Sequence, residues 1–244
     1  MQILSIGNSF STDAHRYLHD IAKSDGVKLQ TFNLFIPGAP LAAHYRNMLS
    51  KERAYLLEMN GRSVGFKVSL EEALLNRSWD VVTIQQNNLE PPKFRAYELY
   101  LEELVAYIRK CVPGAKVMLH QTWAYEEGSP RLTQMMGIAH AQEMLDLSVD
   151  AYNKAAKLVN ADGVIPCGEV FGKMLENGIE KVHRDTYHAG LGLGRFALGL
   201  TWYKCLTGND VMGVSFRDLD VEVTQEGIDT VKKCVTQVTR GYGY

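Results

Sequence analysis

Residues 3–11 decide the fold, and they read Ile3-Leu4-Ser5-Ile6-Gly7-Asn8-Ser9-Phe10-Ser11. A short apolar run stops at Gly7, and Ser9 follows where a helix is expected to begin. In an open α/β sheet this place is the crevice beyond the carboxyl ends of the strands, where ligands bind. A serine there can be a nucleophile if a base and an orienting acid come from elsewhere in the chain.

Composition and charge set the broad class of the protein. The 244 residues suffice for one α/β domain, residues 1–244, with a substantial core. The hydrophobic fraction of 46% and the charged fraction of 22% are typical of a soluble globular protein. The net charge of −2 provides no broad basic field, and no apolar run approaches the roughly 18 residues of a membrane span. We therefore expect no nucleic-acid partner and no membrane partner, and the oligomeric state stays open.

The N-terminus and the cysteines bear on the compartment. The first expected strand begins almost at Met1, so no signal peptide is expected before it. The expected location is cytoplasmic as the sequence stands, and periplasmic or secreted if a leader was removed. Four widely spaced cysteines form no C-x-x-C pair and are expected to be buried, reduced thiols.

Strand-like runs alternate with helical ones, which is typical of a parallel sheet with helices on both faces. The expected strands are residues 2–6, 28–34, 80–85, 115–120 and 164–166. The expected helices are residues 11–25, 41–50, 70–77, 97–111, 142–160, 191–206 and 224–240, the last with Thr224 as its N-cap. Asn60-Gly61 predicts a β-hairpin between residues 54–59 and 63–68. Residues 123–137 have no clear period and are expected to form a loop over the site.

A candidate acid–base pair lies far downstream of Ser9, in Asp185-Thr186-Tyr187-His188. His188 can take the proton of the serine, and Asp185 can bind the other ring nitrogen and fix the tautomer. The order Ser…Asp…His matches serine hydrolases built on an α/β sheet. The first motif is not G-x-S-x-G, however, because Ser11 stands where the second glycine belongs.

Candidate oxyanion donors follow two other expected strands. Gly38 lies in a turn after the second strand, where a backbone N–H can point into the crevice. Gln86, Asn87 and Asn88 directly follow the third core strand, and a side-chain amide there can donate to a developing oxyanion. The other interpretations are a turn glycine and ordinary loop polarity.

Together these motifs resemble the SGNH (GDSL-like) hydrolase superfamily. The chain is most similar to its bacterial DUF4886-type branch, whose members begin with G-N-S-F-S. The similarity extends through residues 121–125, 165–171 and 201–208 and so covers nearly the whole chain. The third block departs from the G-x-N-D pattern of the superfamily, since residues 85–88 read Gln-Gln-Asn-Asn.

The resemblance implies a three-layer α/β/α sandwich with a flavodoxin-like parallel sheet of about five strands and a β-hairpin excursion. It implies ester hydrolysis without a metal or a cofactor. Ser9 is then the nucleophile and first oxyanion donor, Gly38 the second donor, His188 the base and Asp185 its partner. For the third donor, Gln86 is preferred to Asn87.

Further side chains are candidates for substrate contact or for other chemistry. Asn88, Trp123 and Tyr125 are candidate substrate-binding residues, and burial in the core is the alternative for the two aromatic ones. His15 and His19 have the spacing of a zinc site but lack its glutamate, and the glycines of residues 190–194 are expected to allow close packing behind His188.

The sequence therefore predicts a serine esterase. The resemblance implies that its substrates are short acyl esters, particularly acetyl groups, with a small molecule or a glycan as the esterified partner. Two alternatives stay open. One is a carbohydrate-binding or weakly active domain on the same fold, and the other is an acyltransferase.

Overall fold

The computed structural model describes residues 1–242, and within them seven strands form one sheet in the order β4-β3-β2-β1-β5-β6-β7. The strands are β1 (Gln2–Gly7), β2 (Gln30–Phe35), β3 (Tyr55–Met59), β4 (Arg62–Val68), β5 (Val81–Ile84), β6 (Lys116–His120) and β7 (Gly163–Ile165). Strands β2, β1, β5, β6 and β7 are parallel. Their order is 2-1-3-4-5 when they are counted along the chain, which is the flavodoxin-like order.

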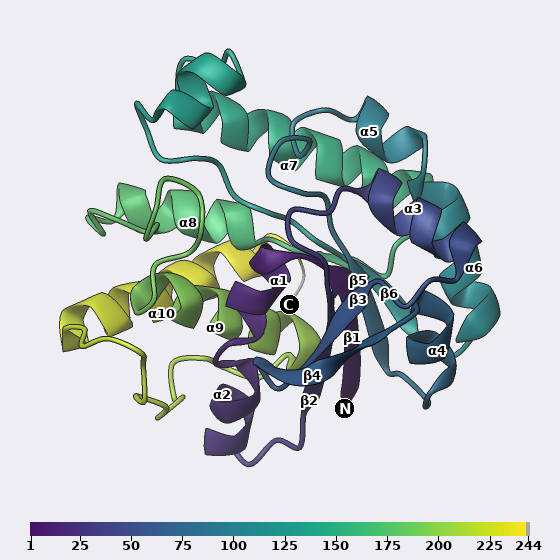
Figure 1. Ribbon diagram of the computed structural model, residues 1–244. Helices are drawn as coiled ribbons and strands as arrows, with labels where there is room; N and C mark the ends of the chain where they lie inside the picture. The colour runs from purple at the N-terminus through teal and green to yellow at the C-terminus, as the bar shows by residue number, and fades with distance from the viewer. Residues whose placement is uncertain (243–244) are drawn as a thin grey trace.

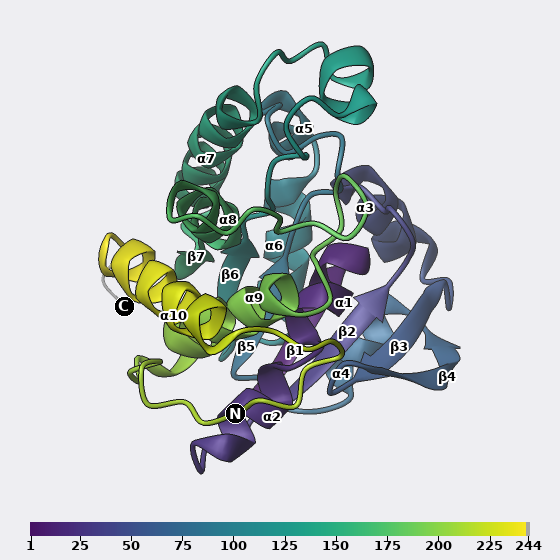
Figure 2. The same cartoon turned by 90° about the vertical axis from the view of Figure 1, so that its left-hand side faces the viewer.

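The β3–β4 hairpin extends this sheet at one edge. Strand β3 pairs antiparallel with β2, and β4 pairs antiparallel with β3 (Figure 2). Asn60 and Gly61 both have positive φ, 49° and 73°, as a two-residue type I′ turn requires. The predicted five-strand parallel sheet with a hairpin excursion is confirmed.

Helices cover both faces of the sheet (Figure 1). One face carries α1 (Ser9–His15), α2 (Leu18–Ser24), α8 (Cys167–Glu176), α9 (Leu193–Thr207) and α10 (Gln225–Arg240). The other carries α3 (Leu41–Ser50), α4 (Leu70–Leu75), α5 (Arg95–Glu98), α6 (Leu101–Cys111) and α7 (Ala141–Leu158). Successive strand residues point to opposite faces of the sheet. Ile3 therefore packs in the core under α1, α8 and α9, and Leu4 packs in the core on the opposite face, under α4 and α6. The three-layer α/β/α sandwich is confirmed.

Several helices differ from the predicted ranges. The helix expected over residues 11–25 breaks at Arg16 and Tyr17, whose side chains bond to Asp220 and to the Leu191 carbonyl. The last helix begins as predicted, since the Thr224 hydroxyl accepts from the Gly227 N–H at 3.1 Å.

Two segments contain helix that the sequence did not indicate. The helix α8 was not predicted, and the expected loop over residues 123–137 contains one π-helical turn, Arg131–Met135.

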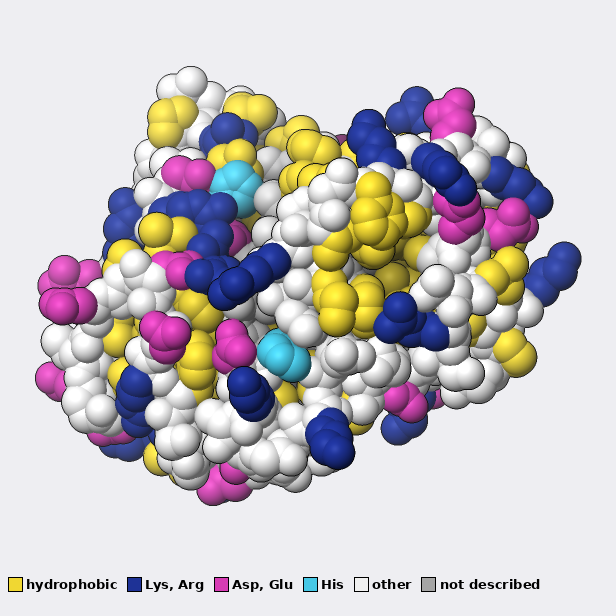
Figure 3. All heavy atoms as spheres, turned by 60° about the horizontal axis from the view of Figure 1, so that its bottom comes forward, with side chains coloured by type: hydrophobic (Ala, Val, Ile, Leu, Met, Phe, Trp, Pro, Cys, Tyr) yellow, Lys and Arg dark blue, Asp and Glu magenta, His cyan; other side chains and the backbone are white. Residues whose placement is uncertain are grey.

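The surface carries charges of both signs. Lysine and arginine side chains lie among aspartate and glutamate side chains on the face in Figure 3, as a net charge of −2 leads one to expect. None of the helices within residues 1–242 is both long and apolar enough to cross a membrane.

Candidate active site

Ser9 stands at a sharp turn between the central strand β1 and helix α1. Asn8 separates the two elements, and its Oδ1 accepts a hydrogen bond from the Phe10 N–H at 3.0 Å, which caps the helix. Gly7 has no room for a side chain, because a Cβ there would lie 2.2 Å from Ser11 Oγ. The turn therefore places Ser9 as the first residue of α1, at the carboxyl edge of the sheet.

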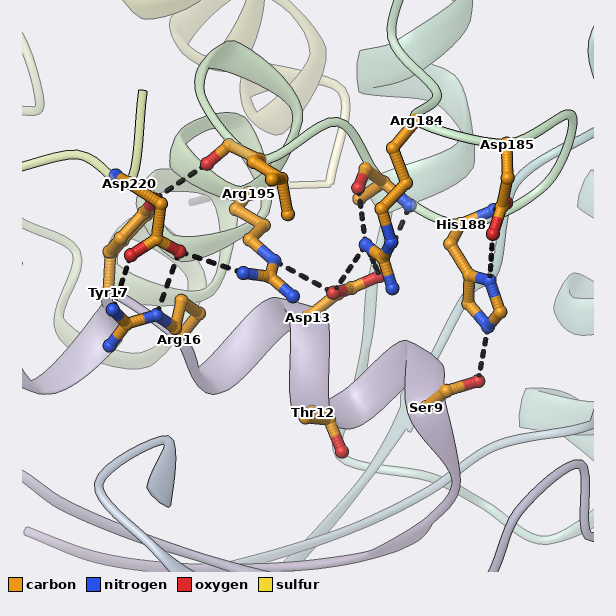
Figure 4. A network of polar contacts seen from close by, with 12 residues as sticks. Ser9, Thr12, Asp13, Arg16, Tyr17, Arg184, Asp185, His188, Arg195 and Asp220 are labelled. Atoms are coloured by element: carbon orange, nitrogen blue, oxygen red, sulfur yellow. Dashed lines mark hydrogen bonds and ion pairs between the residues drawn. The ribbon is translucent and has the colours of Figure 1, made fainter. Parts of the chain in front are cut away.

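Ser9, His188 and Asp185 form one hydrogen-bonded row (Figure 4). His188 Nε2 lies 2.9 Å from Ser9 Oγ, and His188 Nδ1 lies 2.8 Å from Asp185 Oδ2. With the ring proton on Nδ1, His188 donates to Asp185 and accepts the serine hydroxyl through Nε2. The His188 side chain is 15% exposed, so one edge of the row meets solvent. The arrangement suits proton transfer from serine to histidine.

The carboxylate of Asp185 is held in its charged form. Partial burial acts to raise its pKa, but hydrogen bonds from the His188 ring, the His188 N–H and the Tyr187 N–H act against burial, and the net shift of the pKa is downward. Asp185 Oδ1 accepts the His188 N–H at 2.8 Å. Because the same aspartate binds both the ring and the backbone of His188, it fixes the orientation of the imidazole as well as its tautomer.

Asn8 joins three strand ends around the serine. Its Nδ2 donates to the Ala39 carbonyl at 3.1 Å, and its Oδ1 also accepts from Gln85 Nε2 at 2.8 Å. Ala39 follows Gly38, which has a φ of +61° and so adopts a conformation that favours glycine. The loop after β2 is thereby fixed against the turn that carries Ser9.

A cavity of about 350 Å³ opens beside Ser9. It is lined by Asn8, Ser9, Phe10, Pro37, Gly38, Asn88, Tyr187 and His188. The structure thus brings the predicted nucleophile, base, second oxyanion donor and one predicted substrate-binding residue to a single hollow.

Gln86 and Asn87 occupy different surroundings. Gln86 Oε1 accepts the N–H groups of Leu41 and Asn87, and its Nε2 donates to the Ala96 carbonyl at 3.4 Å, so its amide is committed to packing away from the cavity. Asn87 Nδ2 instead lies 3.4 Å from the Gly38 carbonyl oxygen. Neither side chain lines the cavity, and each amide nitrogen already donates to a backbone carbonyl; of the two, Asn87 lies beside the Gly38 turn.

Trp123 and Tyr125 are core residues rather than walls of the cavity. Each is 1% exposed. Trp123 packs on Phe10, with ring centroids 4.5 Å apart, and its Nε1 donates to the Tyr187 carbonyl at 2.7 Å. Both are absent from the cavity lining, so the expected direct contact with substrate does not follow from their positions, and Trp123 supports the loop that carries His188.

Tyr187 is a cavity residue that sequence reasoning did not single out. Its ring lies 3.9 Å from the His188 ring, centroid to centroid, and the Arg131 guanidinium lies 4.1 Å from the Tyr187 centroid. The sequence did carry one indication that Tyr187 lies at the site, because it stands between Asp185 and His188. The π-helical turn of Arg131 thus packs against the loop of the acid–base pair, in keeping with its predicted position over the site.

Other motifs serve structural purposes. His15 and His19 diverge, since His15 Nε2 bonds Ser5 Oγ at 2.9 Å and His19 Nδ1 bonds the Leu29 carbonyl at 2.6 Å. A Cβ on Gly194 would lie 2.7 Å from the Val182 carbonyl, which confirms close packing behind His188. The four cysteines are free thiols, three of them buried and Cys111 partly exposed. Among residues 1–242, no three His, Cys, Asp or Glu side chains gather as a metal site.

The sandwich, the strand order and the Ser–His–Asp row define a chain with the fold of SGNH-like hydrolases. The family model called "Domain of unknown function (DUF4886)" matches residues 2–233, and the chain belongs to that family. Among curated proteins, no sequence matches.

Solved structures agree with the assignment to the DUF4886 family. A DUF4886 family protein from Bacteroides uniformis is 28% identical with a TM-score of 0.92, over 98% of this chain and 95% of that one. A candidate SGNH hydrolase from Slackia heliotrinireducens is 20% identical with a TM-score of 0.61, over 84% of this chain and 98% of that one. A variant of an acetyl xylan esterase from Geobacillus stearothermophilus is 15% identical with a TM-score of 0.53, over 84% of this chain and 92% of that one. The last two likenesses concern the fold alone.

Proposed function

We propose that the protein is a serine esterase that hydrolyses short acyl esters through an acyl-enzyme on Ser9. The observation that carries the proposal is the row of two hydrogen bonds, 2.9 Å and 2.8 Å long, from Ser9 through His188 to Asp185 at the edge of a cavity. A serine hydroxyl is a weak nucleophile until an adjacent base takes its proton, and this row supplies the base and its orienting acid.

The reaction runs in two halves. Ser9 Oγ attacks the ester carbonyl carbon while its proton passes to His188 Nε2, and the resulting tetrahedral oxyanion accepts hydrogen bonds from the N–H groups of Ser9 and Gly38 and from Asn87 Nδ2. Collapse breaks the bond to the alcohol, which leaves with the proton from His188. Water then attacks the acyl-enzyme, His188 takes its proton, and the carboxylic acid departs as Ser9 recovers its hydrogen. Each oxyanion donor is worth about 3–4 kcal/mol of transition-state stabilisation.

The cavity beside Ser9 is where the acyl group of the ester would lie. Its volume is about 350 Å³, and the side chains of Phe10, Pro37 and Tyr187 give it apolar walls. Acetylated carbohydrates are the first natural substrates to test, because two structures of the same fold are an acetyl xylan esterase and a carbohydrate acetylesterase from Sinorhizobium meliloti.

The test compares Ser9→Ala with Ser78→Ala, a substitution at an exposed serine. Wild type and Ser78→Ala should hydrolyse p-nitrophenyl acetate faster than p-nitrophenyl octanoate and should react with a fluorophosphonate probe, and Ser9→Ala should do neither. Equal turnover or labelling in wild type and Ser9→Ala would refute the assignment.

The two alternatives give other results. An acyltransferase would form a new ester when a sugar acceptor is added. A binding domain would retain acetylated glycan without turnover.

A further inference from the structure

Asp13 is a buried carboxylate on the same helix as Ser9, four residues further on. Its side chain is 1% exposed, and residues four apart lie on one side of an α-helix. Arg184 Nη1 donates to both of its oxygens at 2.9 Å, Arg195 Nε donates at 2.8 Å, and the Ala189 N–H donates at 3.1 Å (Figure 4). Helix α1 is thus bonded through one side chain to a loop more than 170 residues away.

The groups that bind Asp13 flank the acid–base pair. Arg184 directly precedes Asp185, and Ala189 directly follows His188. The loop is also closed on itself, because the Arg184 N–H donates to the His188 carbonyl at 3.0 Å and Arg184 Nη1 donates to the Ala189 carbonyl at 2.6 Å. Asp13 therefore holds both ends of the segment that carries Asp185 and His188.

No strand of the sheet supports this segment among the described residues. Its one ladder contact is an isolated bridge between His183 and Ala189. Ser9, by contrast, stands directly after the central strand β1. Two bonds from the segment after β6 also hold the loop, from Trp123 Nε1 to the Tyr187 carbonyl at 2.7 Å and from the Glu126 N–H to the Thr186 carbonyl at 2.8 Å. The Asp13 bonds differ from these because they join the loop directly to the helix that carries Ser9.

The Arg195 side chain belongs to the same charge cluster, but its hydrogen bonds go to Asp13 and Asp220 and not to the loop, which only the Arg195 backbone N–H reaches, at the Gly190 carbonyl. Its Nη1 donates to Asp220 at 2.8 Å, and Arg16 binds the other side of Asp220 (Figure 4). Asp13 and Asp220 are thus bridged by Arg195, which bonds to neither Asp185 nor His188. Loss of the Arg195 side chain should therefore weaken the charge cluster without removing the bonds between Asp13 and the loop.

We propose that Asp13, with Arg184, is a positioning residue that sets the Ser9–His188 geometry. The proposal rests on the proposed function, since a fixed nucleophile–base distance matters only if Ser9 reacts. A misplacement of about 1 Å can lower a rate about 100-fold while leaving substrate binding nearly intact. A purely structural role would instead lower thermal stability and leave kcat unchanged below the melting temperature.

The experiment measures kcat, KM and melting temperature for Asp13→Asn, Arg184→Gln and Arg195→Gln with p-nitrophenyl acetate. Asp13→Asn and Arg184→Gln should lower kcat about 100-fold with KM little changed, well below their melting temperatures. Arg195→Gln, the matched control, should lower the melting temperature and leave kcat close to that of wild type. Wild-type kcat in Asp13→Asn, or an equal loss of kcat in Arg195→Gln, would overturn the proposal.

Hydrogen exchange of residues 183–190 supplies a readout that needs no substrate. Asp13→Asn should speed exchange there, and Arg195→Gln should not. If wild type neither turns over ester nor reacts with fluorophosphonate while exchange changes as expected, the esterase assignment fails and the attachment of the loop by Asp13 stands. If wild type is active and Asp13→Asn alters neither kcat nor exchange, the positioning role fails alone.

Discussion

Replacement of Gly7 by alanine should destabilise the protein through the tight turn below the candidate nucleophile. The added Cβ would lie 2.2 Å from Ser11 Oγ, 3.0 Å from Ser11 Cβ and 3.2 Å from Gln85 Oε1. Neither neighbour is the free end of a flexible side chain. Ser11 is fully buried and accepts the Asn8 N–H at 3.1 Å, and Gln85 Oε1 lies 2.6 Å from a ring nitrogen of His120.

The size of the effect follows from these contacts. Overpacking a core by one methyl group costs about 1–3 kcal/mol. Displacing the Ser11 hydroxyl leaves a buried polar group without a partner, which adds about 1–3 kcal/mol, whereas the smaller entropy of the unfolded alanine chain returns about 0.4–1 kcal/mol. We expect a net loss of about 1–6 kcal/mol in the free energy of unfolding, or a melting temperature about 2–24 °C lower for a chain of this size.

Urea unfolding followed by circular dichroism measures this loss. Gly114→Ala is the matched control, because no atom lies within 4 Å of a Cβ built there and its φ is not positive. Its free energy of unfolding should stay within about 0.5 kcal/mol of wild type. The reasoning is refuted if Gly7→Ala is as stable as Gly114→Ala.

Two further predictions concern pH and the oxyanion donor. Burial lowers the pKa of His15 and His120 to about 3 and that of His44 to about 4, so on acidification the unfolded chain takes up protons first and stability falls as the pH drops below about 6.5. Each of these histidines should lower the free energy of unfolding by about 2 kcal/mol between pH 7.5 and pH 5. His44→Gln should therefore lose about 2 kcal/mol less than wild type over this range, as measured by urea unfolding at the two pH values. An equal loss in the variant and in wild type would contradict the assignment. Asn87→Asp keeps the acceptor for the backbone N–H groups it now binds and removes the amide donor, so kcat should fall about 10²–10³-fold, well beyond the loss in Gln86→Glu. Both variants should melt at a lower temperature, because each loses a donor to a backbone carbonyl and gains a buried charge. Equal losses of kcat in the two variants would show that Asn87 is not the third oxyanion donor.

Local patterns made the nucleophile turn, the hairpin and the last helix predictable. In each case the decisive residues are neighbours in sequence: Gly7 ends β1 two residues before Ser9, Asn60-Gly61 forms the hairpin turn, and Thr224 caps α10. The helix after Ser9 was expected from residue 11, but the Asn8 cap starts it at Ser9. Asp185 and His188 were accessible for the same reason, since three residues separate them and one loop holds both.

The position of the third donor, the helix α8 and the role of Asp13 could not be predicted, because they depend on contacts between residues far apart in the sequence. Gln86 and Asn87 are adjacent amides just beyond β5, and which one lies beside Gly38 depends on how the backbone leaves the strand. The helix α8 begins after Pro166 and contains Gly168, a poor helix former whose missing side chain lets the Thr122 carbonyl approach to 2.4 Å of a Cβ position. Asp13 had one signal, its spacing of four residues from Ser9, but its partners lie at the other end of the chain.

The long separation between Ser9 and His188 has a consequence during synthesis. The two residues are 179 positions apart, and the base lies on a segment that is made after all seven strands. A growing chain therefore exposes its serine long before the histidine exists, and a serine hydroxyl without a base is a weak nucleophile. Under the proposed chemistry, nascent chains and truncation products that end before His188 are inert toward esters, so hydrolysis requires the segment through His188 to be made.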